Sequence, residues 1–281
     1  QAVLMSSLAE RIVKIDSKDE LEKYFRQSNV LLHLYEIGDL DDFFWPQTEW
    51  YAIKDEELKT TFVALVYKGA EPSVIIALGN ETAPGRELLQ GMYAKKLLHN
   101  RFYSHLSLGL PAELSPIYDV ECRGLYRKMG LTNPAAALAV DTTGVVRLHT
   151  EDLQQIESFY RVHYPGNWFD QRMLETTQTF GVWSSGEEDA SSRELIAIAG
   201  VHVFSTTYRV AALGNIAVHT EHRGCGLAGR VTAALVQSLL AEGIEHIGLN
   251  VSASNAAAVA CYTKLGFEPL ADFEEIMWTL K

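Results

Sequence analysis

Cysteine is scarce in this sequence, and the three that occur lie far apart. Cys122, Cys225 and Cys261 form no CxxC pair, so we expect neither a disulfide framework nor a zinc site, and we expect no metal of another kind. Scarce, dispersed cysteines fit a reducing compartment, and a cytoplasmic location is therefore expected.

Long apolar runs and an excess of basic residues are missing as well. No apolar run approaches the roughly 18 residues that span a bilayer, and the N-terminal residues lack the basic-then-apolar pattern of a signal peptide. The formal net charge is −12. Such a balance argues against nucleic acid and against anionic membrane surfaces as partners, since both need clustered Lys and Arg. It says nothing about the oligomeric state.

The second half of the chain alternates strand-like and helix-like segments. Strands are expected at 145–150, 179–185, 195–204, 208–218, 246–253 and 273–280, with a polar hairpin loop at 186–194. Helices are expected over 151–164, over a short stretch capped by Asp170, from the glycine-rich loop to near Gly243, and over 255–266. This order predicts an α/β layer arrangement in one domain.

The first half is less regular. Strands are expected at 29–37, 60–69 and 72–79, the last two as a hairpin, and a helix at 85–100. "LYRKMGL" (125–131) aligns loosely with "CYTKLGF" (261–267) at an offset of 136 residues. We interpret this as a faint internal repeat, although so loose a match also arises by chance. It predicts two domains of related type, 1–140 and 141–281, with the first decayed.

The bare stretch "EHRGCGLAGR" (221–230) lies between an apolar strand and a helix. Free backbone N–H groups at a helix N-terminus bind phosphate, and glycines let the ligand approach closely. Arg223 can add a charge-assisted hydrogen bond. A purely structural turn is the alternative. The letters also spell G-x-G-x-x-G, but the next strand ends without the acid that a dinucleotide site needs.

Two motifs in order resemble the GNAT superfamily of acyl-CoA N-acyltransferases. Arg223, Gly226 and Ala228 match its [Q/R]-x-x-G-x-[G/A] loop, and Asn255, Tyr262 and "KLGF" match the motif that follows. The resemblance covers about 145–281 and implies a mixed, mostly antiparallel sheet flanked by helices. The corresponding region of the first half, 79–91, lacks the loop motif. By similarity to tandem members of this superfamily, we expect the acyl-CoA site in the second half only.

The resemblance also implies the ligand-binding residues. The pantetheine arm of acetyl-CoA would bond to the backbone of the strand end, and the pyrophosphate would lie on the loop: Ile216, Ala217, Val218, Arg223, Gly224, Cys225, Gly226, Leu227, Ala228 and Gly229. Asn255 would bond the same arm or simply cap its helix. Tyr262 would protonate the departing thiolate, with a plain packed tyrosine as the alternative.

The general base is the point where the sequence departs from the family. Many members carry a Glu on the strand before the loop, but 208–218 contains no Asp or Glu. His219, His202, Glu221 and His222 are the candidates. His219, at the strand end, is the tentative base, although a solvated histidine is the plain alternative.

The resemblance implies an N-acetyltransferase that transfers an acetyl group to the amine of a small molecule or peptide. The aromatic segment with Tyr164, Trp168 and Phe169 would line the acceptor pocket, unless these rings only pack in the core. The alternative function is a non-catalytic acyl-CoA-binding or regulatory protein on the same fold.

Overall fold

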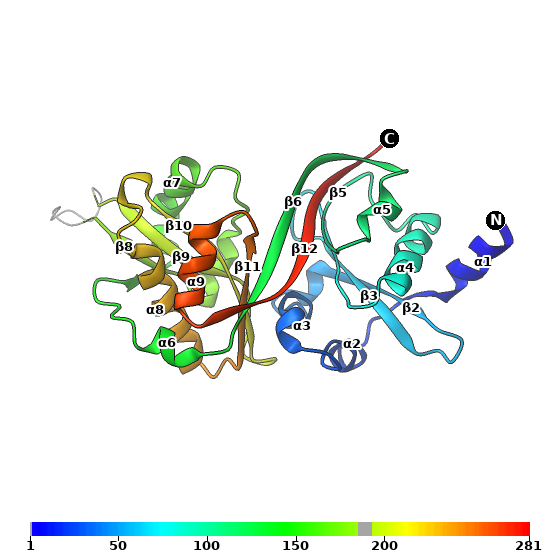
Figure 1. The fold of residues 1–281 in the computed structure, drawn as a ribbon, viewed down its shortest axis with the longest axis horizontal. Coiled ribbons are helices and arrows are strands. Elements are labelled where there is room, and N and C mark those ends of the chain that lie inside the picture. Colours follow the sequence, from blue (N-terminus) through cyan, green and yellow to red (C-terminus); the bar gives the residue numbers. More distant parts are fainter. Residues whose placement is uncertain (1, 185–192) are drawn as a thin grey trace. The chain divides into compact units, whose positions relative to one another are not determined.

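The computed structural model describes residues 2–184 and 193–281, which form two compact units (Figure 1). Unit 1 comprises Gln1–Lys128, Ser252–Ser254 and Ala271–Lys281, and unit 2 comprises Met129–Val251 and Asn255–Leu270. The C-terminal segment of the chain thus packs in the first unit. These units follow contacts rather than chain order, and the division into related domains at 1–140 and 141–281 stays a prediction.

Unit 1 is built around a mostly antiparallel sheet. In the described part of unit 1, strands lie in the order β1-β2-β3-β4-β5-β12; β4 and β5 run parallel, and the other four pairs in this order run antiparallel. Its elements, including the two strands that continue into unit 2, are α1 (Ala2–Arg11), β1 (Ile12–Lys14), α2 (Lys18–Phe25), η1 (Val30–Leu32), α3 (Leu34–Gly38), η2 (Trp45–Gln47), β2 (Thr48–Lys54), β3 (Thr60–Tyr67), β4 (Val74–Ala77), α4 (Thr82–Ala94), β5 (Arg101–Ser107), α5 (Pro111–Leu114), β6 (Tyr118–Leu131) and β12 (Phe267–Leu280).

The core of unit 1 depends on the end of the chain. β12 pairs antiparallel with β5 over Phe273–Thr279 and Arg101–Ser107. Ile276 and Trp278, both fully buried, join the cluster that α4 covers. Burying two such side chains contributes several kcal/mol to stability by area.

Unit 2 has strand order β7-β8-β9-β10-β11, again with a single parallel pair, β10 and β11. Its elements are α6 (Pro134–Leu138), β7 (Val146–Arg147), η3 (Thr150–Asp152), α7 (Leu153–His163), η4 (Gln171–Thr176), β8 (Phe180–Trp183), β9 (Leu195–Ser205), β10 (Val210–Val218), η5 (Thr220–His222), α8 (Leu227–Ala241), β11 (His246–Ser252) and α9 (Ala256–Lys264).

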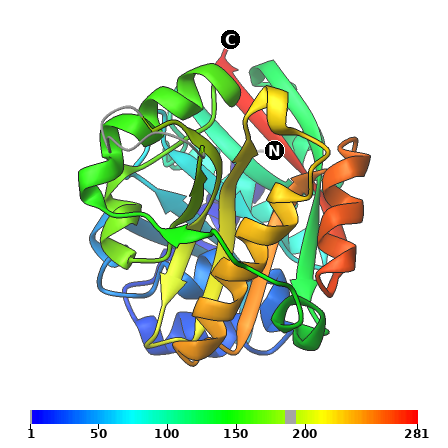
Figure 2. The same cartoon turned by 90° about the vertical axis from the view of Figure 1, so that its left-hand side faces the viewer.

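The strands of unit 2 are covered on both faces. Successive side chains of a strand point to opposite faces, so Ala197 and Ala199 of β9 join the cluster under α8, whereas Ile198 packs with α7. Figure 2 shows α8 packed along one side of these strands. Helix α7 leads into Tyr164, Trp168 and Phe169, the residues expected to line the acceptor pocket, and residues 160–169 are called the acceptor segment below.

The two units share one topology. Each has three successive antiparallel pairs followed by a parallel pair, and in each a single long helix connects the two parallel strands: α4 in unit 1 and α8 in unit 2. This agreement in topology does not depend on similarity between the amino-acid sequences of the two units. The expected hairpin of β3 and β4 is confirmed.

The structure corrects several sequence-based expectations. The segment 29–37 is not a strand but holds η1 and α3, because Asn29 Oδ1 accepts the N–H of Leu31 and starts a helical turn. The helix expected over 85–100 lies at Thr82–Ala94. "LYRKMGL" lies in strand β6, whereas "CYTKLGF" spans the end of helix α9, so this pair of segments is not structurally equivalent. Residue 185 and most of the hairpin loop at 186–194 lie outside the described residues.

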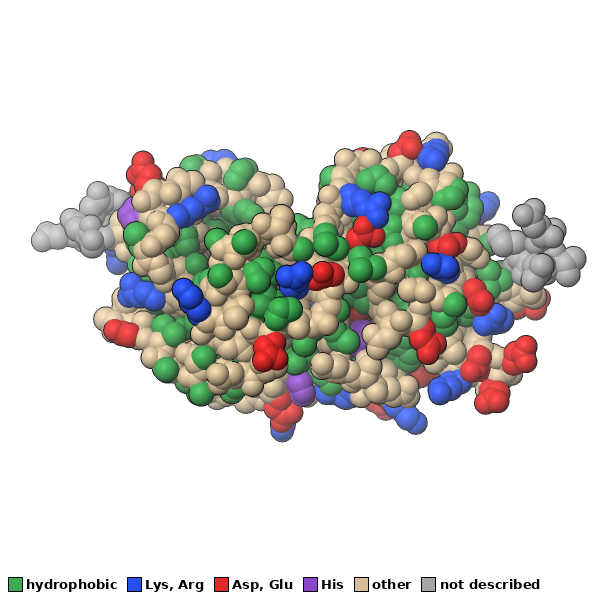
Figure 3. All heavy atoms as spheres, in the orientation of Figure 1, with side chains coloured by type: hydrophobic (Ala, Val, Ile, Leu, Met, Phe, Trp, Pro, Cys, Tyr) green, Lys and Arg blue, Asp and Glu red, His purple; other side chains and the backbone are tan. Residues whose placement is uncertain are grey.

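Among the described residues, no helix is both long and apolar enough to cross a bilayer. Acidic and basic side chains are interspersed over the face shown in Figure 3. Ion pairs such as Arg101 with Glu121 occur among the exposed charged side chains of the protein. This face therefore carries no large field of one sign.

Candidate functional site

The candidate site begins where strands β10 and β11 part. They pair in parallel from Val210 to Leu213, opposite His246 to Leu249, and the pairing ends there although both strands continue. At that point β10 is irregular against β9, with the register shifting between Gly214 and Ala217. Asn215 lies in this bulge with φ of 56°. A bulge bends its strand, and here it coincides with the gap between β10 and β11.

Two side chains from the α7 side hold the bulge. The Tyr160 hydroxyl donates to Asn215 O at 2.7 Å, and Asn167 Nδ2 donates to Asn215 Oδ1 at 3.2 Å. A positive φ is tolerated by Asn better than by most residues, but it still costs energy. The bonds to α7 and its following loop offset that cost and tie the acceptor segment to the strand end.

Past the bulge, backbone groups of β10 face the gap. His219 N–H donates to Ile196 O at 2.8 Å, so the amide of His219 faces β9. Backbone direction alternates along a strand. Val218 and Ile216 therefore direct their N–H and C=O toward the side where β11 has left. Of the predicted pantetheine-binding residues, Ile216 and Val218 thus present hydrogen-bonding groups to the gap, whereas Ala217 faces β9.

The glycine-rich loop leads from the gap to the N-terminus of α8. Gly224 and Gly226 both have φ of 78°, and a Cβ added to either would meet no atom within 4 Å. These two positions therefore favour glycine because of their backbone conformation and not because a side chain would clash with its neighbours. The space that a side chain would occupy is open. Gly226 is the N-cap of α8 and supplies no side-chain cap. The first amides of the helix thus remain available to an anion, and the helix dipole favours one.

Arg223 and Cys225 accompany the loop. Both are exposed. The Arg223 guanidinium contacts the carbonyl oxygens of Val218 and His163, each at 3.4 Å, so it bridges the end of β10 and the end of α7. Cys225 has only a 3.8 Å contact from Sγ to Arg223 O. It fills no core and pairs with no base.

The second predicted motif starts and ends helix α9. Asn255 is the N-cap, and its Oδ1 accepts the N–H of Ala258 at 3.1 Å. Tyr262 is 8% exposed and packs edge-on against Phe267. Burial, then the neighbouring Cys261 and Tyr164, raise the pKa of Tyr262. The phenol therefore keeps its proton near neutral pH and can donate it to a thiolate.

His219 lies in a cluster with His163 and Glu194. The His163 and His219 rings are 3.9 Å apart between centroids. His219 Nδ1 accepts Glu221 N–H at 3.1 Å, and His219 Nε2 lies 3.3 Å from Glu194 Oε1. Both nitrogens of the tentative base thus have partners.

The same three side chains offer ligand atoms within 4.8 Å of one another, a spacing compatible with a metal ion. However, His163 Nδ1 accepts Thr220 N–H as His219 Nδ1 accepts Glu221 N–H. These bonds place each ring proton on Nε2, whereas a metal needs an unprotonated nitrogen with a free lone pair. The donor set does not fit a metal ion in this arrangement.

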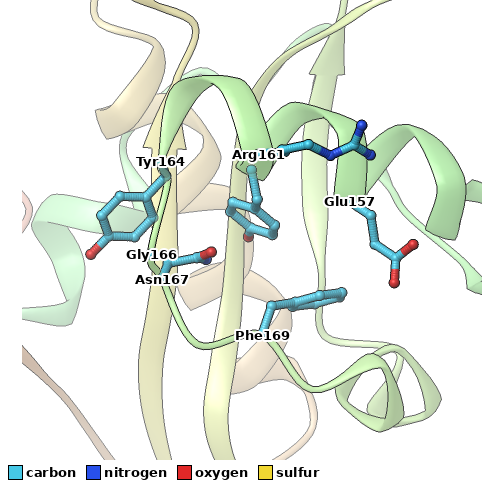
Figure 4. Close-up of a pocket in the computed structure, with 7 residues that line it drawn as sticks. Glu157, Arg161, Tyr164, Gly166, Asn167 and Phe169 are labelled. Carbon is cyan, nitrogen blue, oxygen red and sulfur yellow. The ribbon is translucent and has the colours of Figure 1, made fainter.

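The predicted acceptor residues lie around the bulge. Tyr164 and Phe169 line an open pocket of about 270 Å³ with Tyr160, Asn167 and Gly166, which Glu157 and Arg161 border (Figure 4). In this view the Tyr164 ring points away from Phe169. Trp168 is 40% exposed and faces His202, with the ring centroids 5.9 Å apart. Tyr164 and Trp168 are therefore surface residues and not members of the core.

Unit 1 closes the corresponding gap. Gly79 N–H donates to Ser107 Oγ at 2.9 Å, and the Ser107 hydroxyl donates to Gly79 O at 3.1 Å, just beyond the paired segments of β4 and β5. The connection to α4 is only 78–81, and the N-cap of α4 is Glu81. A carboxylate there repels a phosphate. The region 79–91, which lacks the loop motif, thus follows strands that stay bonded to each other at this end.

Sequence comparison finds a family resemblance in the second half. Residues 144–267 match the model of the acetyltransferase (GNAT) family. Within the chain, 60 residues are 40% identical to an N-acetyltransferase named YobR from Bacillus subtilis, itself described as uncharacterized. This match covers 21% of the chain and spans about a quarter of the relative's length, 24%.

Solved structures share the fold over nearly the whole chain. A Drosophila protein superposes with a TM-score of 0.72 at 13% identity, covering 95% of this chain and 98% of that one. A GNAT-family acetyltransferase from Colwellia psychrerythraea gives 0.57 at 16% identity, over 95% and 99%. A tandem GNAT protein from the clavulanic acid biosynthesis pathway gives 0.52 at 17%, over 95% and 97%. The chain thus has the expected α/β fold, with a mostly antiparallel sheet flanked by helices.

Some residues of the site escaped sequence reasoning. Asn215, Tyr160, Asn167 and His163 carried no motif. The one available signal was Asn215 itself, a turn-forming residue after Gly214 inside an apolar strand run. Its partners, Tyr160 in α7 and Asn167 in the loop that follows, are 55 and 48 residues away in the chain.

Proposed function

We propose that unit 2 is an acyl-CoA-dependent N-acyltransferase that transfers an acetyl group from acetyl-CoA to the primary amine of a small-molecule or peptide acceptor. One observation carries this proposal: the gap between β10 and β11 leads directly to the uncapped N-terminus of α8. The match of residues 144–267 to the model of the GNAT family supports it.

The chain's own groups have distinct tasks in binding. The amides at the start of α8 and those of Gly224 and Gly226 hold the pyrophosphate. The backbone groups of Ile216 and Val218 bond the pantetheine arm in the gap, as a neighbouring strand would. A strand N–H at the same place polarises the thioester carbonyl and stabilises the developing oxyanion.

Transfer then needs one proton removed and one supplied. The amine nitrogen attacks the thioester carbon, and the C–S bond breaks as the C–N bond forms. Tyr262 gives its proton to the leaving sulfur, so coenzyme A departs as a thiol. A base takes one proton from the amine nitrogen, and solvent restores both groups.

Calorimetric titration with acetyl-CoA tests the binding step, and free thiol release across an amine library tests transfer. We expect saturable binding and at least one amine that releases thiol faster than water does. No heat and no thermal shift with millimolar acetyl-CoA would refute the proposal.

A second candidate is a non-catalytic acyl-CoA-binding protein on the same fold. Two observations favour it: β10 carries no carboxylate, and both ring nitrogens of His219 have partners. Tight acetyl-CoA binding without turnover of any amine supports this second candidate over the first.

A further inference from the structure

His202 lies where β10 lacks a side chain. In the pairing of β9 with β10, Val203 is opposite Ala212 and Val201 is opposite Leu213, so His202 occupies the irregularity between them. A Cβ built on Gly214 would lie 1.9 Å from His202 Cδ2 and 2.1 Å from Nε2. The imidazole therefore fills the space that a side chain at Gly214 would take.

This space belongs to the acceptor side of the sheet. His202 faces Trp168, which follows α7, and Asn167 from the same loop bonds Asn215. Gly214 directly precedes Asn215, and the amide of Ile216 faces the gap between the strands. The ring is thus next to the segment that would hold the thioester, on the side from which an amine would arrive.

The other candidate bases are less suited by geometry. His219 is the N-cap of the short turn η5 that follows β10, and its Nδ1 accepts the N–H of Glu221. His222 packs edge-on against His219 beyond the end of β10, and Glu221 is exposed in the same short turn. Each of these lies past the strand end, whereas His202 lies beside its bulge.

We propose that His202 is the general base of unit 2, its imidazole standing in for a carboxylate on β10. This assignment rests on the proposed acyl transfer. As the amine attacks, its nitrogen passes one proton to His202, the C–S bond breaks, and Tyr262 protonates the sulfur. The imidazolium then loses its proton to solvent, and Tyr262 regains one.

The resting imidazole is in the form that a base needs, but it is a weak base. Burial lowers the pKa of His202 to about 4, so the ring is neutral near neutral pH and its protonated form is costly. The charge that forms on it is transient, and the negative charge on the tetrahedral intermediate compensates it.

The test removes the imidazole and then offers it back. In His202→Ala we expect turnover of the best amine from the library to fall about 10²-fold or more. Free imidazole, which fits the vacated space against Gly214, should restore part of it. Acetyl-CoA binding, measured by calorimetry, should change less than about twofold. Loss of turnover without rescue by imidazole assigns a structural role and overturns the proposal, and so does undiminished turnover.

A glycine pair supplies the matched control. Gly214→Ala should displace the ring and reduce turnover like His202→Ala, whereas Gly200→Ala, whose added Cβ lies no closer than 3.7 Å to any atom, should not. If His219→Gln, rather than the His202 variant, loses activity and is rescued by imidazole, the assignment is wrong. A wild-type chain that acetylates no amine overturns this assignment together with the proposed function, whereas an active wild type and an equally active His202→Ala overturn the assignment alone.

Discussion

Ser107 and Gly79 exchange two hydrogen bonds across the end of the β4–β5 pair, through N–H to Oγ at 2.9 Å and hydroxyl to C=O at 3.1 Å. In unit 2 the corresponding strands, β10 and β11, separate after Leu213 and Leu249. One topology thus occurs in a closed form and in an open form within a single chain.

The bonded ends of β4 and β5 in unit 1 lead to a prediction of how many acetyl-CoA molecules one chain binds. Unit 1 lacks both the gap and a glycine-rich connection, so acetyl-CoA should bind only to unit 2. Calorimetry should give one equivalent per chain. A second equivalent that survives Gly226→Glu would show that unit 1 also binds the ligand.

Gly226→Glu should abolish acetyl-CoA binding. The substitution adds a carboxylate to the anion site and forces a non-glycine residue to φ of 78°, which costs about 1–2 kcal/mol. Gly243→Glu is the matched control because Gly243 has φ of 82°, open space around it and a place at the other end of α8. Both variants should lower the melting temperature similarly. If both variants lost binding equally, the loss in Gly226→Glu would be explained by lower stability and not by a blocked anion site.

Tyr262→Phe should lower kcat about 10²-fold while leaving the affinity for acetyl-CoA nearly unchanged, because the lost proton donor acts only as sulfur departs. Tyr164→Phe removes a phenol that is 45% exposed and should alter KM for the amine more than kcat. Unchanged kcat in Tyr262→Phe would leave this tyrosine a packing residue.

Two substitutions of Asn255 distinguish its role as the N-cap of α9 from a role in binding acetyl-CoA. Asn255→Ala should destabilise the chain by about 1 kcal/mol through loss of the N-cap. Asn255→Asp keeps the acceptor oxygen for Ala258 N–H, so we expect normal stability and normal acetyl-CoA binding. Weakened binding in the stable Asp variant would instead assign the side-chain amide to the pantetheine arm.

We predict that the stability of unit 1 depends on pH because of the buried carboxyl group of Glu275. Burial raises its pKa from 4.5 to about 7, against the opposing effects of the Tyr103 hydrogen bond and the charge of Lys128. His105 Nε2 also faces it, 3.5 Å from Oε1. Because the folded state holds this proton more tightly, the contribution is full below pH 4.5 and is lost as pH rises through about 7, with an upper limit of about 3 kcal/mol.

Urea unfolding at pH 5 and pH 8 measures this loss. Glu275→Gln keeps an oxygen for the Tyr103 hydroxyl and cannot ionise, so its stability should fall less over the same range. Parallel pH profiles of wild type and variant would mean that Glu275 does not titrate between the two values.

The elements that could be predicted from the sequence are those that depend on residues close together in the chain. The strand, glycine loop and helix around Gly226 follow from periodicity and backbone freedom over a short stretch, and the structure has them in that order. The segment 29–37 was misassigned because a short apolar run fits both helix and strand, and the cap by Asn29 decided it.

Contacts between distant segments could not be derived. Tyr160 and Asn167 reach Asn215 only because α7 crosses β10, and Gly214 lacks a side chain only because His202 comes from another strand. The likeness of the two halves was expected from letters at 125–131 that lie in a strand. The two units are alike instead in the order and direction of their strands, which a short sequence pattern does not predict.

The placement of Trp278 has a consequence for biosynthesis. This side chain, together with Ile276, completes the core of unit 1 but follows all of unit 2 in the chain. The first unit therefore cannot close its core while the second is being translated, so the usual order, in which the N-terminal domain folds first during synthesis, is unavailable. Nascent chains stalled before residue 271 should expose the unpaired edge of β5 and recruit chaperones until β12 has been synthesised.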